Sequence, residues 1–237
     1  MKPHCLPAGA VDFHAHILPG MDHGSRDLTE ATAQWRMFGA LDLFAVVATP
    51  HFYAQTESSV EEFVARRDAA AELLMTNVSG GPRLALGAEV LLFRGLENMT
   101  GLDRLCIKGT NVLLLEMPYG GFGRAEVVTV ERIAALGLCP LIAHIDRYPT
   151  DALRLLYQSG CARYQVNAEG MLGLLRRRAA DFRKMARDGL VAAIGSDLHG
   201  TDMRALRRFS RACGRLGDTA KAVMSESRDL LANASLI

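Results

Sequence analysis

Three histidines and two aspartates fall within twelve positions near the start of the chain, and their side chains suit metal binding. They are Asp12, His14, His16, Asp22 and His23, in a stretch that opens with Val-Asp-Phe-His-Ala-His-Ile. Because one residue separates His14 from His16, both side chains point to the same side of an extended strand and can reach one metal ion. A lone pair of this kind is more often core packing or surface polarity than a ligand pair. The metal interpretation therefore depends on the rest of the chain.

Apolar periodicity predicts the elements that would position such a site. Apolar runs bounded by turn residues predict seven strands, at residues 11–16, 44–49, 83–90, 111–117, 139–145, 163–168 and 191–194. Amphipathic runs predict helices at residues 28–40, 60–75, 125–136, 151–159, 172–187, 203–216 and 219–231. Strands that alternate with helices are typical of a parallel α/β sheet or barrel.

Polar side chains gather where the predicted strands end. Six of the seven histidines lie at or just beyond the carboxyl end of a predicted strand, and Glu89, Glu116 and Asp197 do too. In (β/α) barrels the active site is built on that face. Glu116 ends an apolar run, and a carboxylate buried there needs a partner because burying a lone charge is costly. One multinuclear metal site is therefore predicted from nine residues: His14, His16, His23, His51, Glu89, Glu116, His144, Asp197 and His199.

Length and composition restrict the class of protein. With 237 residues, 49% hydrophobic and 22% charged, the chain is expected to form a single domain over residues 1–237. A net charge of +1 gives no general attraction to nucleic acid or membrane. Neither a run of ~20 apolar residues nor a signal-peptide segment is seen, which predicts a cytoplasmic protein with no membrane span. Charges expected on the outer face of helix 60–75 leave a homo-oligomer open.

The five cysteines do not indicate a cysteine-based site. They are scattered, odd in number and without Cys-x-x-Cys spacing, so neither a disulfide framework nor a thiolate zinc site is expected. Cys5 follows a histidine, as does the nucleophile of cysteine-dependent tyrosine phosphatases, in which an arginine comes after five further residues. Val11 stands at that position here. We therefore interpret Cys5 as structural.

Taken in order, the motifs resemble the PHP (polymerase and histidinol phosphatase) superfamily. They are Asp-Phe-His-Ala-His at 12–16, Thr-Pro-His at 49–51, Gly-Ala-Glu at 87–89, Leu-Glu-Met-Pro at 115–118, Ala-His-Ile-Asp-Arg-Tyr at 143–148 and Gly-Ser-Asp-Leu-His-Gly at 195–200. The stretches His-Ile-Leu-Pro-Gly-x-Asp and Ala-His-x-x-Arg-Tyr are most similar to the branch of manganese-dependent protein-tyrosine phosphatases from capsule and exopolysaccharide operons. The resemblance spans nearly the whole chain. It implies an α/β fold, a distorted (β/α)7 TIM-like barrel of PHP type, with a trinuclear metal centre at the carboxyl ends of the strands.

Carried over residue by residue, the resemblance implies three sets of ligands. They are His14, His16, Glu89 and Asp197 for the first ion; Glu116 and His144, with Glu89 bridging, for the second; and His23, His51 and His199 for the third. Manganese is the metal implied, with zinc or iron as alternatives. The branch usually has Asp-Asp-Gly where this chain has residues 22–24 as Asp-His-Gly. Because the second Asp is a ligand there and other branches carry a histidine, His23 is admissible as a ligand.

Two further residues are predicted to assist catalysis. Arg147 lies close to His144 in sequence, and its planar guanidinium suits two oxygens of a phosphate. The alternative for Arg147 is a surface ion pair with Asp146 or Asp151. Asp12 suits a partner that orients a ligand histidine.

The reaction that the resemblance implies is hydrolysis of a phosphoester by metal-bound hydroxide, without a covalent intermediate. Two metal ions about 3.5–4 Å apart would clamp the phosphate oxygens and lower the pKa of a bridging water. By resemblance the substrate is phosphotyrosine on a bacterial tyrosine autokinase that regulates polysaccharide export, and the product is inorganic phosphate. Two alternatives stay open: a small-molecule phosphatase acting on histidinol phosphate or a sugar phosphate, and a regulatory module with a vestigial metal site.

Overall fold

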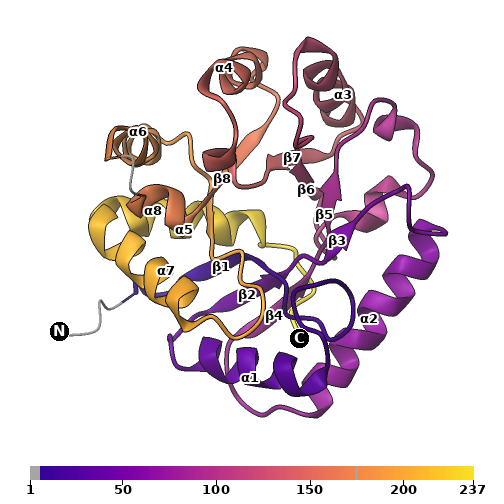
Figure 1. Ribbon diagram of the computed structural model, residues 1–237, viewed down its shortest axis with the longest axis vertical. Coiled ribbons are helices and arrows are strands. Elements are labelled where there is room, and N and C mark those ends of the chain that lie inside the picture. Colours follow the sequence, from indigo (N-terminus) through magenta and orange to yellow (C-terminus); the bar gives the residue numbers. More distant parts are fainter. Residues whose placement is uncertain (1–5, 174–175) are drawn as a thin grey trace.

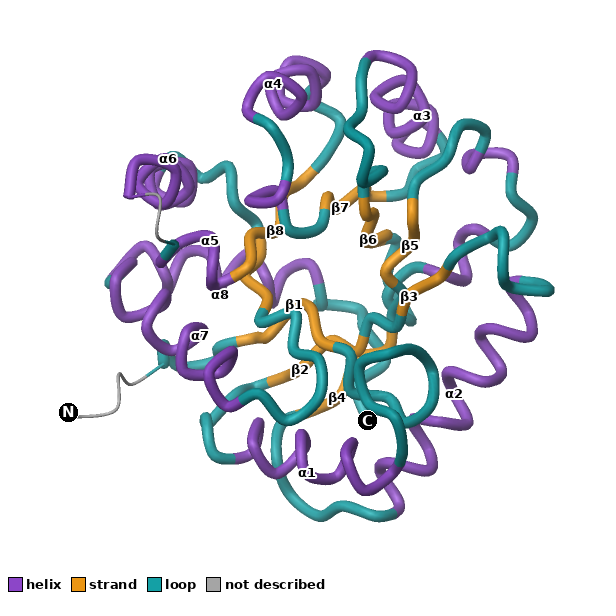
Figure 2. The backbone as a smooth tube through the Cα atoms, in the orientation of Figure 1, coloured by secondary structure: helices purple, strands orange, loops and turns teal. Residues whose placement is uncertain are grey.

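A curled parallel sheet forms the centre of the molecule, and helices surround it (Figures 1 and 2). The structure is a computed structural model that describes residues 6–173 and 176–237. The interpretation of Cys5 concerns a residue outside this described part. The cysteines within it, Cys106, Cys139, Cys161 and Cys213, are free thiols.

The strands belong to two hydrogen-bonded sheets in which every pairing is parallel. The first sheet has the order β1 (Val11–Ala15), β2 (Ala45–Ala48) and β4 (Arg83–Leu86). The second has the order β3 (His51–Phe52), β5 (Glu89–Leu91), β6 (Val112–Glu116), β7 (Cys139–Ile142), β8 (Arg163–Asn167) and β9 (Ala193–Gly195). The two sheets adjoin at two places. β2 and β4 of the first sheet lead into β3 and β5 of the second, and β1 lies beside β9.

Two interruptions explain why the described chain has nine strands where the sequence predicts seven. Residues 49–50 separate β2 from β3, and residues 87–88 separate β4 from β5. The breaks contain Pro50 and a glycine, which are the residues that most weaken a strand ladder. Hydrogen bonding continues across them, because Glu89 N–H donates to the carbonyl of Pro50 at 3.0 Å. The predicted strand at residues 83–90 is therefore wrong as a single element, although β4 and β5 together span the same stretch of chain.

The barrel closes between its first and last strands. Ala15 at the end of β1 pairs with Leu198 just beyond β9, and His16 N–H donates to the Leu198 carbonyl at 3.1 Å. Around the barrel, β2 and β3 together occupy one strand position, and so do β4 and β5. The barrel therefore has seven strand positions. The predicted TIM-like α/β barrel is confirmed.

The helices lie between the strands or after the last strand in sequence, and outside the strands in space (Figure 1). Six match the prediction to within one residue at each end: α1 (Leu28–Gly39), α2 (Val60–Thr76), α3 (Arg124–Ala135), α4 (Thr150–Ser159), α7 (Met203–Leu216) and α8 (Asp218–Leu230). Asp27 and Ser59 cap α1 and α2 by accepting backbone N–H groups, as N-cap residues do. Pro149 precedes α4 and provides no side-chain cap.

The predicted helix at residues 172–187 is wrong in extent. The structure has a short α5 (Ala168–Leu172) and then α6 (Arg176–Arg187), because Gly173 takes up an extended conformation after Leu172. Three short 3-10 helices that were not predicted are η1 (Leu96–Asn98), η2 (Leu102–Leu105) and η3 (Ile145–Arg147). None of the helices in the described ranges combines the length and apolar character that crossing a bilayer requires.

Two apolar clusters hold the barrel together. The smaller one fills the inside of the barrel with side chains from several strands, among them Phe13, Val47 and Leu114. The larger one lies between the strands and the helices that cover them. Trp35 belongs to the larger cluster, and its indole N–H donates to the carbonyl of Gly80 at 2.8 Å.

The expectation that the charges of helix 60–75 lie on its outer face is wrong for Arg67 of α2. Arg67 is only 2% exposed, and its guanidinium donates to Asp68 and to the carbonyl of Gly87. A buried guanidinium needs such partners because burying an unpaired charge is costly. Arg67 thus stabilises the break between β4 and β5 by donating to the carbonyl of Gly87.

Candidate metal centre

The nine residues predicted as ligands form one cluster at the carboxyl ends of the strands. β1 carries His14, β3 begins with His51, β5 begins with Glu89 and β6 ends with Glu116. The other members follow β1, β7 and β9 in the loops. Parallel strands that curl into a barrel bring these ends together, which is why residues up to 185 positions apart in sequence meet here.

The first group contains two imidazoles and two carboxylates that face one point. The Nε2 atoms of His14 and His16 are 3.1 Å apart. Glu89 Oε2 lies 3.1 Å from His14 Nε2 and 3.4 Å from His16 Nε2. Asp197 Oδ1 lies 3.7 Å and 3.4 Å from the same two atoms. This donor set, which equals the first predicted set, suits a divalent first-row metal ion.

Glu89 also belongs to a second group. Its Oε1 atom lies 2.6 Å from His144 Nε2, and Glu116 Oε1 lies 3.6 Å from that nitrogen. Donor atoms of His51, Glu89 and Glu116 all fall within 4.8 Å of one another. A carboxylate with one oxygen in each of two groups is placed to bridge two ions.

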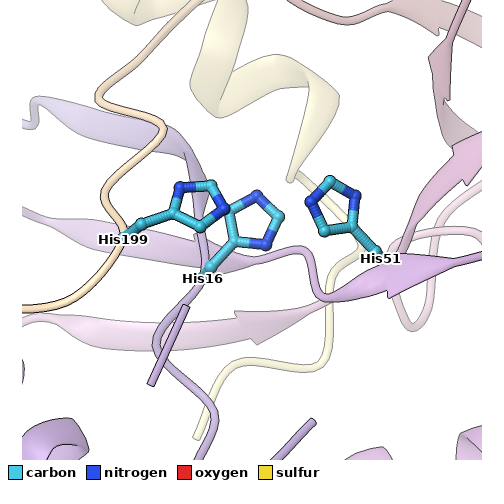
Figure 3. Close-up of side chains that lie close together, drawn as sticks. All are labelled: His16, His51 and His199. Atoms are coloured by element: carbon cyan, nitrogen blue, oxygen red, sulfur yellow. The ribbon is translucent and has the colours of Figure 1, made fainter. Parts of the chain in front are cut away.

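Three histidine rings form the third group (Figure 3). Figure 3 shows His16 lying between His199 and His51, and their donor atoms all lie within 4.8 Å of one another. The predicted set had His23 where this group has His16. The imidazole of His23 is exposed and stacks on the rings of His199 and His51, with centroids 4.5 Å and 5.0 Å apart.

Buried atoms without partners test whether these residues fit a metal ion. Within the described chain, five such atoms of the cluster have no hydrogen-bond partner: Glu89 Oε2, Glu116 Oε1 and Oε2, His51 Nδ1 and His199 Nε2. Each unpaired buried polar atom costs about 1–3 kcal/mol, so several in one place call for a ligand. Because the atoms are carboxylate oxygens and imidazole nitrogens, divalent cations fit them.

The charges of the cluster depend on one another. Burial opposes protonation of His14 and His16, but the carboxylates of Glu89 and Asp197 outweigh it and raise the pKa of both imidazoles. Burial also opposes ionisation of Glu89 and Asp197, yet the histidines hold the pKa of both carboxyls below the usual range. The pKa of His199 falls to about 4, because it is buried beside His16. The buried carboxylates thus require positive charge nearby.

Asp22 is a supporting residue that the sequence analysis did not assign. Its Oδ2 atom lies 2.7 Å from His16 Nδ1 and accepts the backbone N–H of His51 at 2.9 Å. A carboxylate on the second nitrogen of a ligand histidine fixes the ring and its tautomer. Gly24 permits this arrangement, because a Cβ there would lie 2.2 Å from the Cβ of His16. The available signal was the place of Asp22 in the ligand-rich opening stretch.

β8 supplies a second set of supporting residues that were not assigned. Gln165 Oε1 lies 3.3 Å from His14 Nδ1 and accepts the backbone N–H of His144 at 2.6 Å. Gln165 Nε2 donates to Asn167, whose own Nδ2 donates to Asp197 Oδ2 at 3.0 Å. This chain of amides connects three candidate ligands. The available signal was that Gln165 and Asn167 alternate with Tyr164 and Val166 on this strand, which places both amides on one face.

Tyr148 fixes the ring of His144. Its hydroxyl lies 3.1 Å from His144 Nδ1 and accepts the backbone N–H of Met117 at 3.0 Å.

Two of the candidate ligands, His144 and Asp197, have left-handed backbone conformations with φ of 30° and 52°. Such conformations are strained for residues with a Cβ and are concentrated at functional sites.

The predicted role of Asp12 is wrong in its detail. Asp12 Oδ1 accepts the backbone N–H groups of Ser196 at 2.8 Å and His14 at 3.4 Å, and the ring of His14 faces Gln165 instead. Burial raises the pKa of Asp12 to about 6. Asp12 therefore joins the backbone of β1 to the loop that carries Asp197.

Arg147 lies at the rim of the cluster. Its side chain is 45% exposed and its guanidinium donates to Asp197 Oδ2. Neither Asp146 nor Asp151, the alternatives weighed above, is its partner: Asp146 accepts the backbone N–H of Asn167 instead, and Asp151 pairs with Arg154. Arg147, Asp197 and His199 line a cavity of about 170 Å³ that opens beside the cluster.

Comparison with known proteins finds similarity over most of the chain. The sequence model of a family described as capsular polysaccharide synthesis, CpsB/CapC, matches residues 10–216. The chain is 28% identical over 215 residues to the tyrosine-protein phosphatase CpsB of Streptococcus pneumoniae, which covers 82% of this chain and 84% of that protein. It is 24% identical over 203 residues to the tyrosine-protein phosphatase YwqE of Bacillus subtilis, with 82% and 79% covered.

A solved structure has the same fold. It comes from a study of YwqE from Bacillus subtilis and CpsB from Streptococcus pneumoniae, described as unique metal-dependent tyrosine phosphatases. The TM-score is 0.77 at 20% identity, and the match covers 96% of each chain. The fold is therefore shared over nearly the whole of both chains.

Proposed function

The chain belongs to the CpsB/CapC family of capsular polysaccharide synthesis, and from this we infer that it is a metal-dependent protein-tyrosine phosphatase. Membership agrees with the branch that the motifs predicted. Two relatives are named tyrosine-protein phosphatases. The observation that carries the proposal is Glu89, whose two oxygens face two separate groups of donor atoms. The proposed substrate is phosphotyrosine on a bacterial tyrosine autokinase of capsular or exopolysaccharide synthesis, and the product is inorganic phosphate.

The proposed cofactors are three divalent ions, manganese by family resemblance and zinc or iron as alternatives. The residues that would hold them are His14, His16, Glu89 and Asp197; Glu89, Glu116 and His144; and His23, His51 and His199. Such ions act as Lewis acids towards phosphoryl oxygens and make water a nucleophile near neutral pH. Unpartnered buried oxygens and nitrogens in all three groups support this assignment.

Side chains at the rim are proposed to bind the phosphorylated residue. The guanidinium of Arg147, now paired with Asp197, can donate to two phosphate oxygens instead. Tyr53 stacks on His51 with centroids 5.1 Å apart, and Tyr119 is 74% exposed in the loop after β6. Burial, together with the hydrogen bond and charge of Glu116, raises the pKa of Tyr119 to about 12, so its hydroxyl stays protonated. Two aromatic side chains beside the cluster suit a phenyl ring.

The remaining parts of the proposal follow from this chemistry. Phosphotyrosine made from ATP arises in the cytoplasm, so the protein is proposed to act there. Residues 1–237 are proposed to act as a single PHP-type domain, because α8 near the carboxyl end packs against β1 and β9 of the barrel. A vestigial site is disfavoured, because the complete donor set is present. A small-molecule phosphatase stays the second candidate, since the metal cluster itself suits any phosphate monoester.

Hydrolysis assays test the proposal. Para-nitrophenyl phosphate, phosphotyrosine peptides and histidinol phosphate are offered to the protein with and without added manganese. We expect metal-dependent hydrolysis of the peptides, and His14→Ala and Asp197→Asn should each lower it at least about 100-fold with unchanged circular dichroism. Asp188→Asn, an exposed aspartate of a surface ion pair, is the matched control and should keep full activity. Preference for histidinol phosphate, or near-normal turnover in either ligand variant, would contradict the proposal.

A further inference from the structure

A basic groove on the surface begins beside the metal centre. It lies between α5, α6 and α7, which are neighbours on the side of the barrel near β8 (Figures 1 and 2). Its volume is about 630 Å³, and the charged side chains that line it are Glu169, Arg183, Arg208, Arg211 and Arg215. Four arginines against one glutamate give the lining of the groove an excess of positive charge.

Positive charge is concentrated on two of these helices. Residues 176–187 and 203–216 together contain eleven Lys or Arg and one Asp, whereas the whole chain contains 27 basic and 26 acidic residues. Like charges three or four residues apart destabilise a helix. Folding explains some of these arginines, because Arg178 donates to the carbonyl of Tyr148 and Arg183 to that of Met171, and an anionic ligand gives a reason for others.

Arg208, Arg211 and Arg215 form one row along α7. Their spacing of three and four residues places them on the same face of the helix, over a length of about 10 Å. Arg208 pairs with Glu169 at 3.4 Å. Arg211 and Arg215 are exposed, and neither has an ion pair within the described chain. An extended peptide spans about 10 Å in three residues, so its side chains can match the row.

The groove is continuous with the metal centre. Glu169 and Arg208 line both the groove and the smaller cavity that Arg147, Asp197 and His199 border. A peptide whose phosphorylated residue reaches Arg147 can therefore continue along α7 without leaving the surface. This connection joins the anion site to the substrate of the metal centre.

We propose that the groove binds an acidic segment of the phosphoprotein substrate, adjoining the phosphotyrosine in sequence. The proposal rests on the phosphatase function inferred above and extends it to sequence preference. A guanidinium pairs with two oxygens of a carboxylate or of a phosphate, so glutamate, aspartate or a second phosphorylated side chain fits the row. Continuity with the metal centre favours a peptide over nucleic acid or an anionic membrane.

Kinetics on designed peptides test the proposal. Three phosphotyrosine peptides carry neutral residues, glutamates, or a non-hydrolysable phosphonate of phenylalanine beside the phosphotyrosine, on either side in turn. We expect kcat/KM for both acidic kinds to exceed that of the neutral peptide by about 3- to 10-fold. Comparing glutamate with phosphonate identifies the preferred anion. The advantage should shrink as salt rises, because exposed charges are screened.

Variants locate the effect. Arg211→Gln with Arg215→Gln should abolish the preference for acidic peptides and leave hydrolysis of para-nitrophenyl phosphate unchanged. Arg36→Gln with Arg104→Gln removes the same charge from arginines that line neither the groove nor the cavity, and should keep the preference. Equal kcat/KM for all peptides in the wild type would overturn the proposal. Loss of duplex DNA or anionic vesicle binding in the groove variant, with peptide kinetics unchanged, would overturn it as well.

A binding measurement separates this proposal from the phosphatase function. A fluorescent glutamate-rich peptide with phenylalanine in place of phosphotyrosine is titrated into the metal-free protein, and its anisotropy is followed. We expect salt-sensitive binding that the groove variant weakens and the control variant does not. Absence of hydrolysis of every phosphotyrosine substrate would refute the phosphatase function alone, whereas absence of peptide binding would refute the groove.

Discussion

At the scale of single residues, Arg147 is proposed to exchange its partner Asp197 for the oxygens of a bound phosphate. Its guanidinium is held at the rim by Asp197, and because an arginine has only donors it cannot itself bind a metal ion. Arg147→Ala should raise KM for a phosphotyrosine peptide and the inhibition constant of free phosphate by about 10-fold, since charge-assisted pairs are worth about 1.5–3 kcal/mol. Metal content, measured by plasma mass spectrometry, should not change. Arg154→Ala, at an exposed arginine paired with Asp151, is the control, and unchanged constants for Arg147→Ala would make Arg147 structural.

His23 allows a test of the third metal set. It stacks on His51 and His199, and it stands where the related branch carries aspartate. A histidine ligand leaves the centre one positive charge higher than an aspartate and favours zinc, iron or cobalt over manganese. His23→Asp should therefore shift the ranking of activating metals towards manganese and move the acidic limb of the pH–rate profile to higher pH. His23→Asn separates charge from ring loss. An identical metal ranking and acidic limb in wild type and His23→Asp would show that His23 is not a ligand.

The cluster of candidate ligands could be predicted from the sequence, whereas the contacts that support these residues could not. His144 and Asp197 stand at strand ends, and strand ends meet in any parallel barrel. Which group contacts the second nitrogen of a histidine depends on rotamers and on pairing between distant strands. Gln165 reaches His14 across 151 positions, and no local pattern contains that pairing. Asp12 was misplaced for the same reason, because its partners are backbone N–H groups.

At the scale of the elements, helix bounds could be predicted closely but strand continuity could not. Caps such as Ser59 and regular apolar spacing define a helix locally. An apolar run of eight residues, in contrast, is equally consistent with one strand or two. The break at residues 87–88 depends on how the barrel bends and on Arg67 binding the carbonyl of Gly87. The same bend places Glu89 at the start of β5, where its two oxygens face two groups of donors.

β9 approaches β1 closely at Gly195. This residue is not a candidate ligand, so changing it tests the packing between the two strands. A Cβ on Gly195 would lie 2.5 Å from the Cβ of His14 and 2.7 Å from Gln165 Nε2. Gly195→Ala should therefore displace His14, weaken metal binding about 10- to 100-fold and lower stability by about 1–3 kcal/mol. Isothermal titration calorimetry with manganese and denaturant unfolding measure the two effects. Gly39→Ala, where a Cβ meets nothing closer than 3.7 Å, is the control, and normal metal affinity in Gly195→Ala would contradict the geometry.

At the scale of the whole molecule, the buried charges of the centre determine how stability depends on pH. In the metal-free protein the pKa values of His14 and His16 are raised above the ordinary 6.5. Their protonated forms therefore stabilise the fold fully below pH 6.5, and this contribution is lost as the pH rises through the raised folded values. The pKa values of Glu89 and Asp197 are lowered from 4.5 and 3.8, so their contribution is present above those values and lost in stronger acid.

Divalent ions bound at the proposed centre would replace the protons of His14 and His16 as the positive charge that the carboxylates need, so the metal-loaded protein should not lose stability in the same way. The difference in Tm between manganese-loaded and chelator-treated protein should widen from pH 6 to pH 8.5. It should reach roughly 5–10 °C when free metal exceeds Kd by about 100-fold. Differential scanning calorimetry at several pH values measures this, with magnesium-free buffer throughout. The control is Asp197→Asn, in which the widening should be smaller because one carboxylate is removed. A difference in Tm that stays constant from pH 6 to pH 8.5 would show that protons and metal ions do not compete for this cluster.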